Sequence, residues 1–135
     1  MIDVVTAVIK RNKKILILKR GEKVRTYKGK WACVSGYLEK NEDALGRAIK
    51  EIEEETGLKR EEVKLIKKGK PIEFYDEKEK IKWRVHPFLF KANKDEIKID
   101  WEHTTYKWIE PQEIKNYETV PKLKEVIFSL VNDIR

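Results

Sequence analysis

The sequence predicts an α/β (α+β) fold in which a mixed β-sheet is flanked by a helix on each face. The strand expected at residues 15–19 is apolar on both faces, so both sides of the sheet must be covered. Segments 41–56 and 121–134 carry apolar residues at helical spacing and supply these covers. Because the 135 residues contain no Pro/Gly/Ser-rich linker, we expect a single domain over residues 1–135.

Strands are predicted wherever β-branched and aromatic residues stand between turn signals. We expect them at residues 4–10, 15–19, 63–66, 72–75, 81–90 and 105–109. A polar, basic loop over residues 21–30 leads to a short apolar piece at 31–34, which ends in Ser35-Gly36. A short turn of helix is expected at residues 111–114, which begin with a proline.

Two helices are predicted. The first covers residues 41–56, with Asn41 as its N-cap, Glu42 and Asp43 in its first turn, and Gly57 as its C-terminal stop. The second follows Pro121 near the C-terminus. Its apolar positions follow the i, i+3, i+4, i+7 pattern and are Leu123, Val126, Ile127, Leu130, Val131 and Ile134.

The composition excludes several classes of protein. Apolar residues make up 40% of the chain, which is too many for a disordered protein. The uncharged apolar runs are only a few residues long, so we expect no membrane-spanning helix and no membrane as partner. The start of the chain lacks a signal-peptide pattern, and the single cysteine, Cys33, cannot form an internal disulfide, so we expect a cytoplasmic protein. Cys33 lies in an apolar stretch and is expected to be buried rather than nucleophilic.

The net charge of +7 is concentrated at one end of the chain. Residues 1–30 hold ten basic and two acidic residues, a balance of +8, whereas the remaining 105 residues hold 21 basic and 22 acidic residues. A localised excess of positive charge favours an anionic partner, either nucleotide phosphates or an RNA backbone. A lysine-rich solvated surface explains the same excess equally well.

Four carboxylates lie near the C-terminal end of the first predicted helix, in the run Lys-Glu-Ile-Glu-Glu-Glu-Thr-Gly at residues 50–57. There the helix dipole is negative and like charges four residues apart repel, so this arrangement is destabilising unless a cation offsets it. Because residues three and four apart share a face, Glu51, Glu54 and Glu55 can bring their oxygens to one spot. Such hard oxygen ligands suit Mg²⁺ or Mn²⁺.

On spacing alone, these carboxylates fit a solvated charged face equally well, with ion pairs from Arg47 to Glu51 and from Lys50 to Glu54. The wider pattern over residues 36–58 is Gly-x5-Glu-x7-Lys-Glu-Ile-x-Glu-Glu-x-Gly-Leu. It closely resembles the signature of the Nudix hydrolase family, Gly-x5-Glu-x7-Arg-Glu-U-x-Glu-Glu-x-Gly-U, in which U is a bulky aliphatic residue. Every specified position matches except residue 50.

The resemblance implies the family's α/β/α sandwich, a mixed sheet flanked by the Nudix helix and a C-terminal helix. It also implies hydrolysis of a pyrophosphate bond in a nucleoside diphosphate-linked small molecule, with Mg²⁺ or Mn²⁺ as cofactor. Mapped onto this chain, Glu51, Glu54 and Glu55 would hold the metal and Gly36 would shape the backbone beside it. A metal-bound water attacks phosphorus while a carboxylate takes its proton, and Glu54, Glu55 and Glu102 all stay open as that base.

Lys50 is the departure from the signature, because the family has an arginine there that braces the neighbouring carboxylates. Lysine cannot form a planar bidentate clamp, but it can still neutralise one glutamate. We therefore place Lys50 in the catalytic cluster and expect reduced or retuned activity. On this basis Lys50→Arg is expected to raise metal-dependent turnover.

Residues outside the signature are candidates for binding the substrate. Glu102 precedes a predicted strand and is the best acidic candidate, with an exposed turn carboxylate as the competing interpretation. The aromatic candidates to stack on a nucleobase are Tyr27, Trp31, Trp83 and Trp101. The basic candidates for outer phosphates are Lys19, Arg20, Lys23, Arg25, Lys28 and Lys30. We expect His86 and His103 to be hydrogen-bonded structural residues, and Trp108 to belong to the core.

Two other functions stay open on the sequence alone. A Nudix-fold module with weak or no activity can bind a nucleotide or RNA through the basic N-terminal segment, and an enzyme that removes 5′ phosphates from RNA combines both features. RNA is open as a partner but is not favoured. Homodimers are common in the family, so a homodimer is a further expectation. The nucleotide itself is not disclosed, because loops outside the signature set specificity.

Overall fold

The computed structural model describes residues 1–131, which contain eight strands, two α-helices and two 3₁₀ helices. The strands are β1 (Ile2–Arg11), β2 (Lys14–Arg20), β3 (Trp31–Ala32), β4 (Val34–Tyr37), β5 (Val63–Lys68), β6 (Ile72–Asp76), β7 (Ile81–Ala92) and β8 (His103–Ile109). The helices are α1 (Ala44–Thr56), α2 (Leu123–Val131), η1 (Arg60–Glu62) and η2 (Pro111–Asn116).

All six predicted strands are present, and each extends at least one residue beyond its predicted bounds. The apolar piece at residues 31–34 divides into β3 and β4, so that Ser35-Gly36 lies within β4 rather than after a strand. The turn of helix predicted at residues 111–114 is confirmed as η2.

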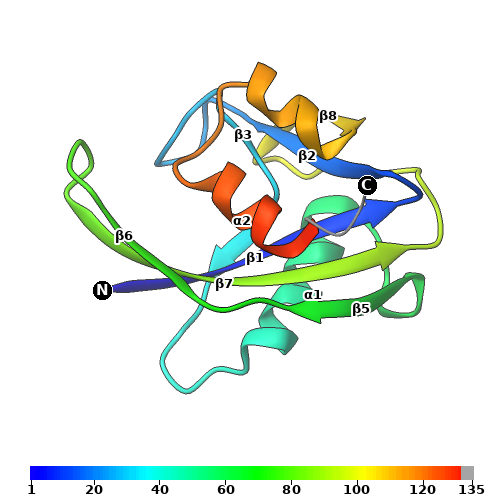
Figure 1. Ribbon diagram of the computed structural model, residues 1–135, viewed down its shortest axis with the longest axis horizontal. Coiled ribbons are helices and arrows are strands. Elements are labelled where there is room, and N and C mark those ends of the chain that lie inside the picture. The colour runs from blue at the N-terminus through cyan, green and yellow to red at the C-terminus, as the bar shows by residue number, and fades with distance from the viewer. Residues whose placement is uncertain (132–135) are drawn as a thin grey trace.

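The strands form one mixed sheet with the order β3-β2-β1-β7-β5, while β4 pairs with β1, β6 with β7 and β8 with β2. The helices α1 and α2 cover opposite faces of this sheet (Figure 1). The predicted α/β sandwich is therefore confirmed. No helix in the described part of the chain is long and apolar enough to span a membrane.

The central strand β1 has different neighbours along its two edges. On one edge it pairs in parallel with β7 from Ile2 to Lys10. On the other edge Val4 to Ala7 pair with β4, whereas Lys10 and Arg11 pair with β2. The sheet therefore divides beside β1, and β4 leads the chain from this division to α1.

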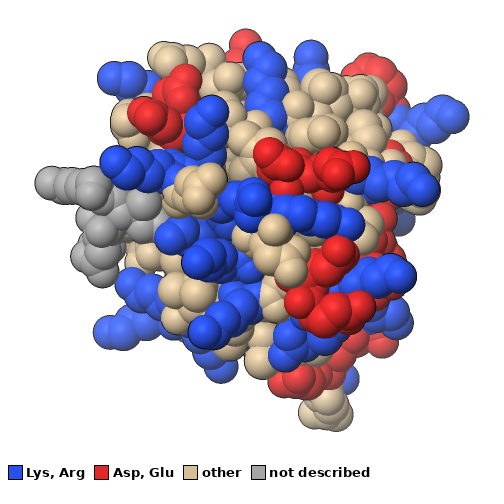
Figure 2. Space-filling view, turned by 90° about the vertical axis from the view of Figure 1, so that its right-hand side faces the viewer, with Lys and Arg blue, Asp and Glu red and all other residues tan. Residues whose placement is uncertain are grey.

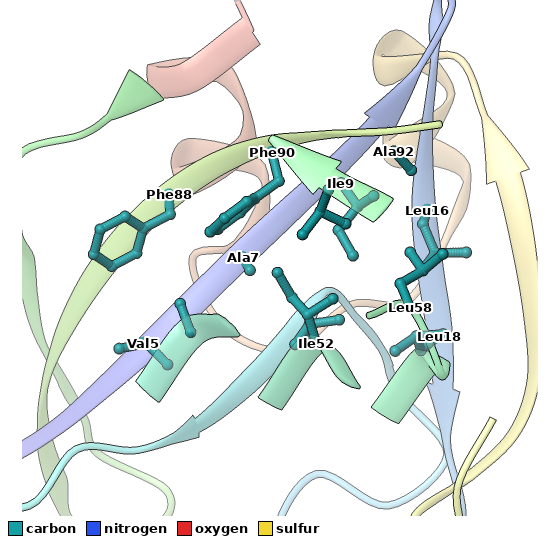
Figure 3. Packing of buried hydrophobic residues seen from close by; sticks show 13 residues of the cluster. Val5, Ala7, Ile9, Leu16, Leu18, Ile52, Leu58, Phe88, Phe90 and Ala92 are labelled. Carbon is teal, nitrogen blue, oxygen red and sulfur yellow. The ribbon is translucent and has the colours of Figure 1, made fainter. Parts of the chain in front are cut away.

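The core has two halves, one on each face of the sheet. In β2, Leu16 and Leu18 face α1, whereas Ile15 and Ile17 belong to the half under α2, which confirms that both faces are covered. Figure 3 shows the α1 half, in which side chains of the helix meet those of the strands. Cys33 is buried in the α2 half, and burial raises the pKa of its thiol to about 12, so it is not a nucleophile, as expected.

The start of α1 differs from the prediction. The N-cap is Asp43 rather than Asn41, and the carboxylate of Asp43 accepts a hydrogen bond from the backbone N–H of Gly46 at 2.9 Å. Asn41 instead adopts a left-handed backbone with φ 67° in the preceding loop, and Glu42 precedes the helix instead of lying in its first turn. The predicted stop is confirmed, since Gly57 has φ 76° and donates its N–H to Glu53 O at 2.9 Å.

The C-terminal helix α2 begins two residues after Pro121 and is described as far as Val131. Five of its six predicted apolar positions are buried, whereas Ile134 lies outside the described residues. Trp108, expected in the core, is half-buried: it packs against the α1 half, and its Nε1 donates to Asp95 O at 2.9 Å.

The basic residues of the N-terminal segment do not form one patch. Lys10 and Lys14 lie at the β1–β2 turn, about 20 Å along the strand from Val4. Figure 2 shows the side of the molecule toward which β1 and β7 end, where many Lys and Arg side chains are gathered. On these strands and on β5, Lys10, Lys91 and Lys64 stand in register. The charge excess of residues 1–30 is therefore split between this end and the loop at residues 21–30.

Asp3 ties β1 to β7 through an ionic hydrogen-bond network. The Arg84 guanidinium donates from Nε to Asp3 Oδ1 at 2.5 Å, and His86 Nε2 lies 2.8 Å from the same oxygen. These hydrogen bonds lower the pKa of Asp3 from 3.8 to about 2. Because the carboxylate is the form that the folded state favours, the network stabilises the fold above about pH 4, and this stability is lost as the pH falls toward 2.

We expect Asp3→Asn to lower the free energy of unfolding by about 1 kcal/mol at pH 7, since the pair is partly exposed and screened. The difference from the unmodified protein should shrink below about pH 4 and vanish below about pH 2, where Asp3 is protonated in both states. Urea unfolding at a series of pH values measures this, with Asp95→Asn on an exposed loop as the control. An equal loss at pH 2 and pH 7 would contradict an ionic origin.

Candidate active site

A cleft of about 300 Å³ lies on the α2 face of the sheet, between the first half of β1, the β6–β7 hairpin and the start of α2. Side chains of two kinds line it. Acidic groups come from the end of α1 and from the loop before β8, and aromatic groups come from the loop at residues 21–30, from β4 and from the hairpin. Seven of the residues predicted for the site line the cleft, namely Arg20, Tyr27, Gly36, Glu51, Glu54, Trp83 and Glu102.

Backbone hydrogen bonds bring the acidic groups together although they are far apart in the sequence. The N–H of Lys98 donates to Thr56 O at 2.9 Å, which fastens the loop of residues 93–102 to the end of α1. The N–H of Gly21 donates to Glu102 O at 2.8 Å and joins the same loop to the end of β2. Glu102 therefore lies beside the α1 carboxylates.

The Glu51 side chain passes directly against the backbone of Gly36. A Cβ atom at position 36 would lie 2.4 Å from Glu51 Cδ and 2.7 Å from its Oε2, so only glycine leaves room for this carboxylate. Gly36 is itself fixed by the sheet, because it pairs with Val5 of β1. The signature glycine thus leaves room for a carboxylate, and pairing with β1 holds its strand in place.

Glu55 is deeply buried, with 3% of the residue exposed. Burial raises the pKa of Glu55 well above its usual range, and the neighbouring Glu51 raises it further through its charge and a shared hydrogen bond. His103 Nε2 lies 3.8 Å from Glu55 Oε1, and His103 Nδ1 lies 2.7 Å from Asp100 Oδ1. Burial lowers the pKa of His103, so the imidazole does not supply a positive charge to offset the carboxylates.

The donor set fits a hard divalent cation. Within residues 1–131 no three carboxylate, histidine or cysteine side chains are grouped closely enough to hold an ion in the arrangement described. Yet Glu51 and Glu54 both face the cleft, the charge of Glu51 disfavours ionisation of Glu55 behind them, and Gly36 keeps the space open. A divalent cation would reverse the repulsion, and Glu54 is exposed and able to change its rotamer.

Arg47, rather than Lys50, contacts the signature glutamates. Its Nη1 donates to Glu51 Oε2 at 2.9 Å, which confirms the ion pair predicted between these residues. Its Nε donates to Glu42 Oε2 at 2.8 Å. Lys50 is exposed, and among the described residues it forms neither the ion pair predicted with Glu54 nor another one.

The aromatic side of the cleft is built around Trp83. The ring of Tyr37 is stacked on that of Trp83, with centroids 6.3 Å apart and planes inclined by 23°, and the ring of Tyr27 lies 6.4 Å away. The Tyr27 hydroxyl accepts a hydrogen bond from Trp83 Nε1 at 3.1 Å and donates one to Asp76 Oδ2 at 2.6 Å. Tyr27 therefore fixes the basic loop to the β6–β7 hairpin, and Tyr27 and Trp83 are the predicted aromatics that line the cleft.

Three other predicted binding residues lie away from the cleft. The Trp31 ring packs edge-on against Tyr117 at 5.3 Å, because pairing with β2 directs it toward the segment before α2. Trp101 is 68% exposed and does not line the cleft. Lys30 forms an ion pair with Glu118 at 2.8 Å and lines a second pocket instead.

This second pocket adjoins the cleft, since Tyr27 and Pro121 line both. Its charged lining residues are Arg25, Lys28, Lys30, Asp76, Lys78 and Glu79. Asp76 is engaged by the Tyr27 hydroxyl and by the backbone N–H groups of Lys78 and Glu79. Among the described residues, no ion pair involves Arg25, Lys28 or Lys78, so these three cations remain available to an anion.

Sequence reasoning gave no functional role to Tyr37, Arg47 or His103, which all belong to this site. Tyr37 directly follows Gly36, and Arg47 precedes Glu51 by one helical turn, so their spacing from the signature residues indicates a place near the site. His103 has no such indication in the sequence, because its place beside Glu55 depends on how the loop of residues 93–102 folds back.

Comparison with known proteins identifies one family and several solved structures of similar fold. The chain matches the family described as NUDIX domain over residues 1–130. A Caenorhabditis elegans Ap4A hydrolase, solved as a binary complex, is 18% identical, with 99% of this chain and 98% of that chain covered at a TM-score of 0.81. A MutT protein from Methanosarcina mazei Go1 is 25% identical, with 98% and 93% covered at a TM-score of 0.75.

A bifunctional NMN adenylyltransferase/ADP ribose pyrophosphatase from Francisella tularensis, complexed with AMP and a manganese ion, is 24% identical at a TM-score of 0.77. The match covers 99% of this chain and 42% of that longer chain. No match is found among curated proteins.

We expect Gly36→Ala to weaken Mn²⁺ binding about tenfold or more, because the new methyl group displaces the Glu51 carboxylate. Calorimetric titration with Mn²⁺ measures the effect, and circular dichroism checks the fold. Gly46→Ala is the matched control, since its methyl group would meet only the Asp43 carboxylate, at 3.1 Å. Unchanged Mn²⁺ binding in Gly36→Ala would show that the close approach to Glu51 does not matter.

Proposed function

The chain belongs to the Nudix family of pyrophosphohydrolases, and from this premise we propose that it hydrolyses the pyrophosphate bond of a nucleotide held in the cleft. One observation carries the proposal. The signature glutamates Glu51 and Glu54 share a single cleft with Glu102 and with an aromatic wall, so a phosphate-binding end and a base-binding end adjoin. This arrangement fits a nucleoside diphosphate-linked small molecule, and the cleft volume suits part of such a ligand.

The residues proposed to hold Mg²⁺ or Mn²⁺ are Glu51, Glu54 and Glu55. When bound, such an ion neutralises phosphate oxygens and lowers the pKa of a coordinated water. The carboxylates gathered at the cleft support this assignment, because Arg47 and Arg20 offset only part of their mutual repulsion. The manganese ion in the Francisella tularensis protein, a relative of the same fold, supports a divalent cofactor as well.

Of the three carboxylates considered as general base, Glu54 and Glu102 line the cleft and Glu55 does not. Burial and the nearby Asp100 raise the pKa of Glu102, which makes its carboxylate a stronger proton acceptor near neutral pH. We therefore assign Glu102 to take the proton of the attacking water. The charge of Arg20 interacts with Glu102 in the same cleft, and its guanidinium donates from Nε to Thr26 O at 3.0 Å. We propose that Arg20, held in this way, binds a phosphate oxygen.

The nucleobase is proposed to bind at the aromatic side of the cleft. Tyr37 is 56% exposed and already stacked on the buried Trp83, so it offers an open face to a second flat ring. The hydrogen bonds of Tyr27 to Trp83 and Asp76 hold this wall in place before a ligand arrives. Stacking of this kind tolerates different bases, so this contact by itself does not select one nucleobase.

The decisive experiment is product analysis after incubation with Mg²⁺ or Mn²⁺ and a panel of nucleoside triphosphates, ADP-ribose and dinucleoside polyphosphates. We expect cleavage within the polyphosphate that needs the metal and falls on the order of 100-fold in Glu54→Gln. Glu53→Gln is the matched control, because Glu53 is exposed on the same helix and does not line the cleft. Equal rates in both variants, or cleavage without metal, would contradict the proposal.

A second candidate substrate class is a nucleotide that carries a further phosphate, such as the 5′ end of RNA. The observation that favours it is the second pocket, where Arg25, Lys28 and Lys78 adjoin the base-binding side of the cleft. A chain leaving the nucleoside on that side would bring its next phosphate to these cations.

For this candidate, we expect the double variant Arg25→Gln/Lys28→Gln to raise the KM for a 5′-triphosphorylated oligonucleotide about tenfold while that for ATP changes little. The KM for the oligonucleotide should also rise steeply with salt concentration. Lys13→Gln/Lys14→Gln, at the distant β1–β2 turn, removes the same charge and serves as the control. A flat salt response, or equal effects of both double variants, would exclude RNA as the substrate.

A further inference from the structure

The guanidinium of Arg47 joins two glutamates of the signature, Glu42 and Glu51. It lies 2.6 Å from Glu42 Oε2 through Nη2 and 2.9 Å from Glu51 Oε2 through Nη1, so one planar group contacts both carboxylates. Such a fork orients its acceptors as well as neutralising them. The three side chains are largely shielded from solvent, with exposed fractions of 19% for Arg47, 26% for Glu42 and 11% for Glu51.

The network has a fixed outer anchor. Glu42 Oε1 accepts a hydrogen bond from the backbone N–H of Glu39 at 2.9 Å, while its Oε2 holds Arg47. Arg47 is thereby held from the loop side, and Glu51 is held between Arg47 and the backbone of Gly36. The Glu51 carboxylate is thus restrained on two sides.

Residue 50, where the family has its bracing arginine, does not take part in this network. The Lys50 side chain is exposed, although its charge still acts on Glu42. Arg47 and Lys50 lie three residues apart on α1, so both can reach toward the same carboxylate. Because the charge of Lys50 already acts on Glu42, we expect a guanidinium at position 50 to reach this carboxylate as well.

We propose that Arg47 is the positioning residue of this site and performs for Glu51 the bracing that the signature arginine performs elsewhere in the family. The bracing arginine is then present, but it lies about one helical turn before the position that it has in the signature. This inference rests on the proposed function, since Glu51 is there assigned to hold the metal. It replaces the expectation that Lys50→Arg by itself restores a missing brace.

Arg47 acts on orientation, and this separates it from a simple charge effect. Removing a nearby positive charge by itself strengthens the binding of a cation. Releasing the Glu51 carboxylate weakens it instead, because supporting partners of a metal ligand are typically worth about 10–100-fold in affinity. Weaker Mn²⁺ binding after loss of Arg47 is therefore diagnostic of positioning.

The test compares four proteins, namely the unmodified chain, Arg47→Gln, Lys50→Arg and the double variant Arg47→Gln/Lys50→Arg. Calorimetric titration without substrate gives the Mn²⁺ dissociation constant, and steady-state kinetics gives kcat and KM. For Arg47→Gln we expect about tenfold weaker Mn²⁺ binding and about tenfold lower kcat, with KM within about twofold. Arg60→Gln, on the exposed turn η1, is the control for loss of one arginine charge.

The interaction between positions 47 and 50 is the sharpest readout. We expect Lys50→Arg to restore most of the Mn²⁺ affinity lost in Arg47→Gln, and to change the affinity of the chain that keeps Arg47 far less. No recovery in the double variant, or equal effects of Lys50→Arg in both backgrounds, would overturn the proposal. If Arg47→Gln does not fold, Arg47→Lys keeps the charge without the fork and should still bind Mn²⁺ more weakly.

Failure of this inference is distinguishable from failure of the proposed function. If the unmodified chain cleaves no nucleotide, the proposed function fails, yet the Mn²⁺ titrations of the four proteins still decide the role of Arg47. If cleavage occurs and Arg47→Gln loses only thermal stability, with Mn²⁺ affinity and kcat intact, then Arg47 is structural and the inference fails alone.

Discussion

The close approach of the Glu51 side chain to the backbone of Gly36 is the contact on which this site depends. It requires a strand without a side chain at one position, a helix ending at a fixed distance from that strand, and a carboxylate directed into the gap. The division of the sheet beside β1 supplies the geometry, because β4 pairs with only the first half of β1 and then delivers the chain to α1. The strand pairing of the sheet and the spacing of the signature residues therefore meet the same geometric requirement, which is to bring Glu51 against Gly36.

That requirement concentrates negative charge where it is least stable. The glutamates lie at the negative end of the helix dipole. Glu55 is buried beside Glu51, and its neighbour His103 has a lowered pKa, which favours the neutral imidazole. Arg47 offsets part of this charge, but it engages only one oxygen of Glu51. The cation site proposed above gives a physical reason for such a cluster, since packing alone would favour apolar residues there.

Periodicity allowed most of the fold to be predicted from the sequence, because the two helices and six of the strands bury faces whose spacing is visible in the chain. Local choices between neighbouring polar residues were harder. Asn41 and Asp43 both suit an N-cap, and only the backbone of the loop, left-handed at Asn41, decides for Asp43. In the site, the signature identified the α1 carboxylates, whereas the direction of Trp31 and the place of His103 depend on strand pairing and loop closure between segments distant in sequence.

The acidic and aromatic sides of the cleft differ in how strictly the fold fixes the spacing of their residues. The signature glycine and the last three signature glutamates lie on β4 and α1, whose relative position the sheet fixes, so their spacing in the sequence is strict and recognisable. The aromatic wall adds to Tyr37 of β4 the loop at residues 21–30 and the β6–β7 hairpin, which also line the second pocket. The hydroxyl of Tyr27 joins this loop to the hairpin. That junction consists of the two hydrogen bonds of the Tyr27 hydroxyl, with Asp76 and Trp83, and involves none of the α1 carboxylates. Under the proposed function, substrate specificity is therefore expected to depend on this loop and hairpin, the segments whose sequence pattern was least informative.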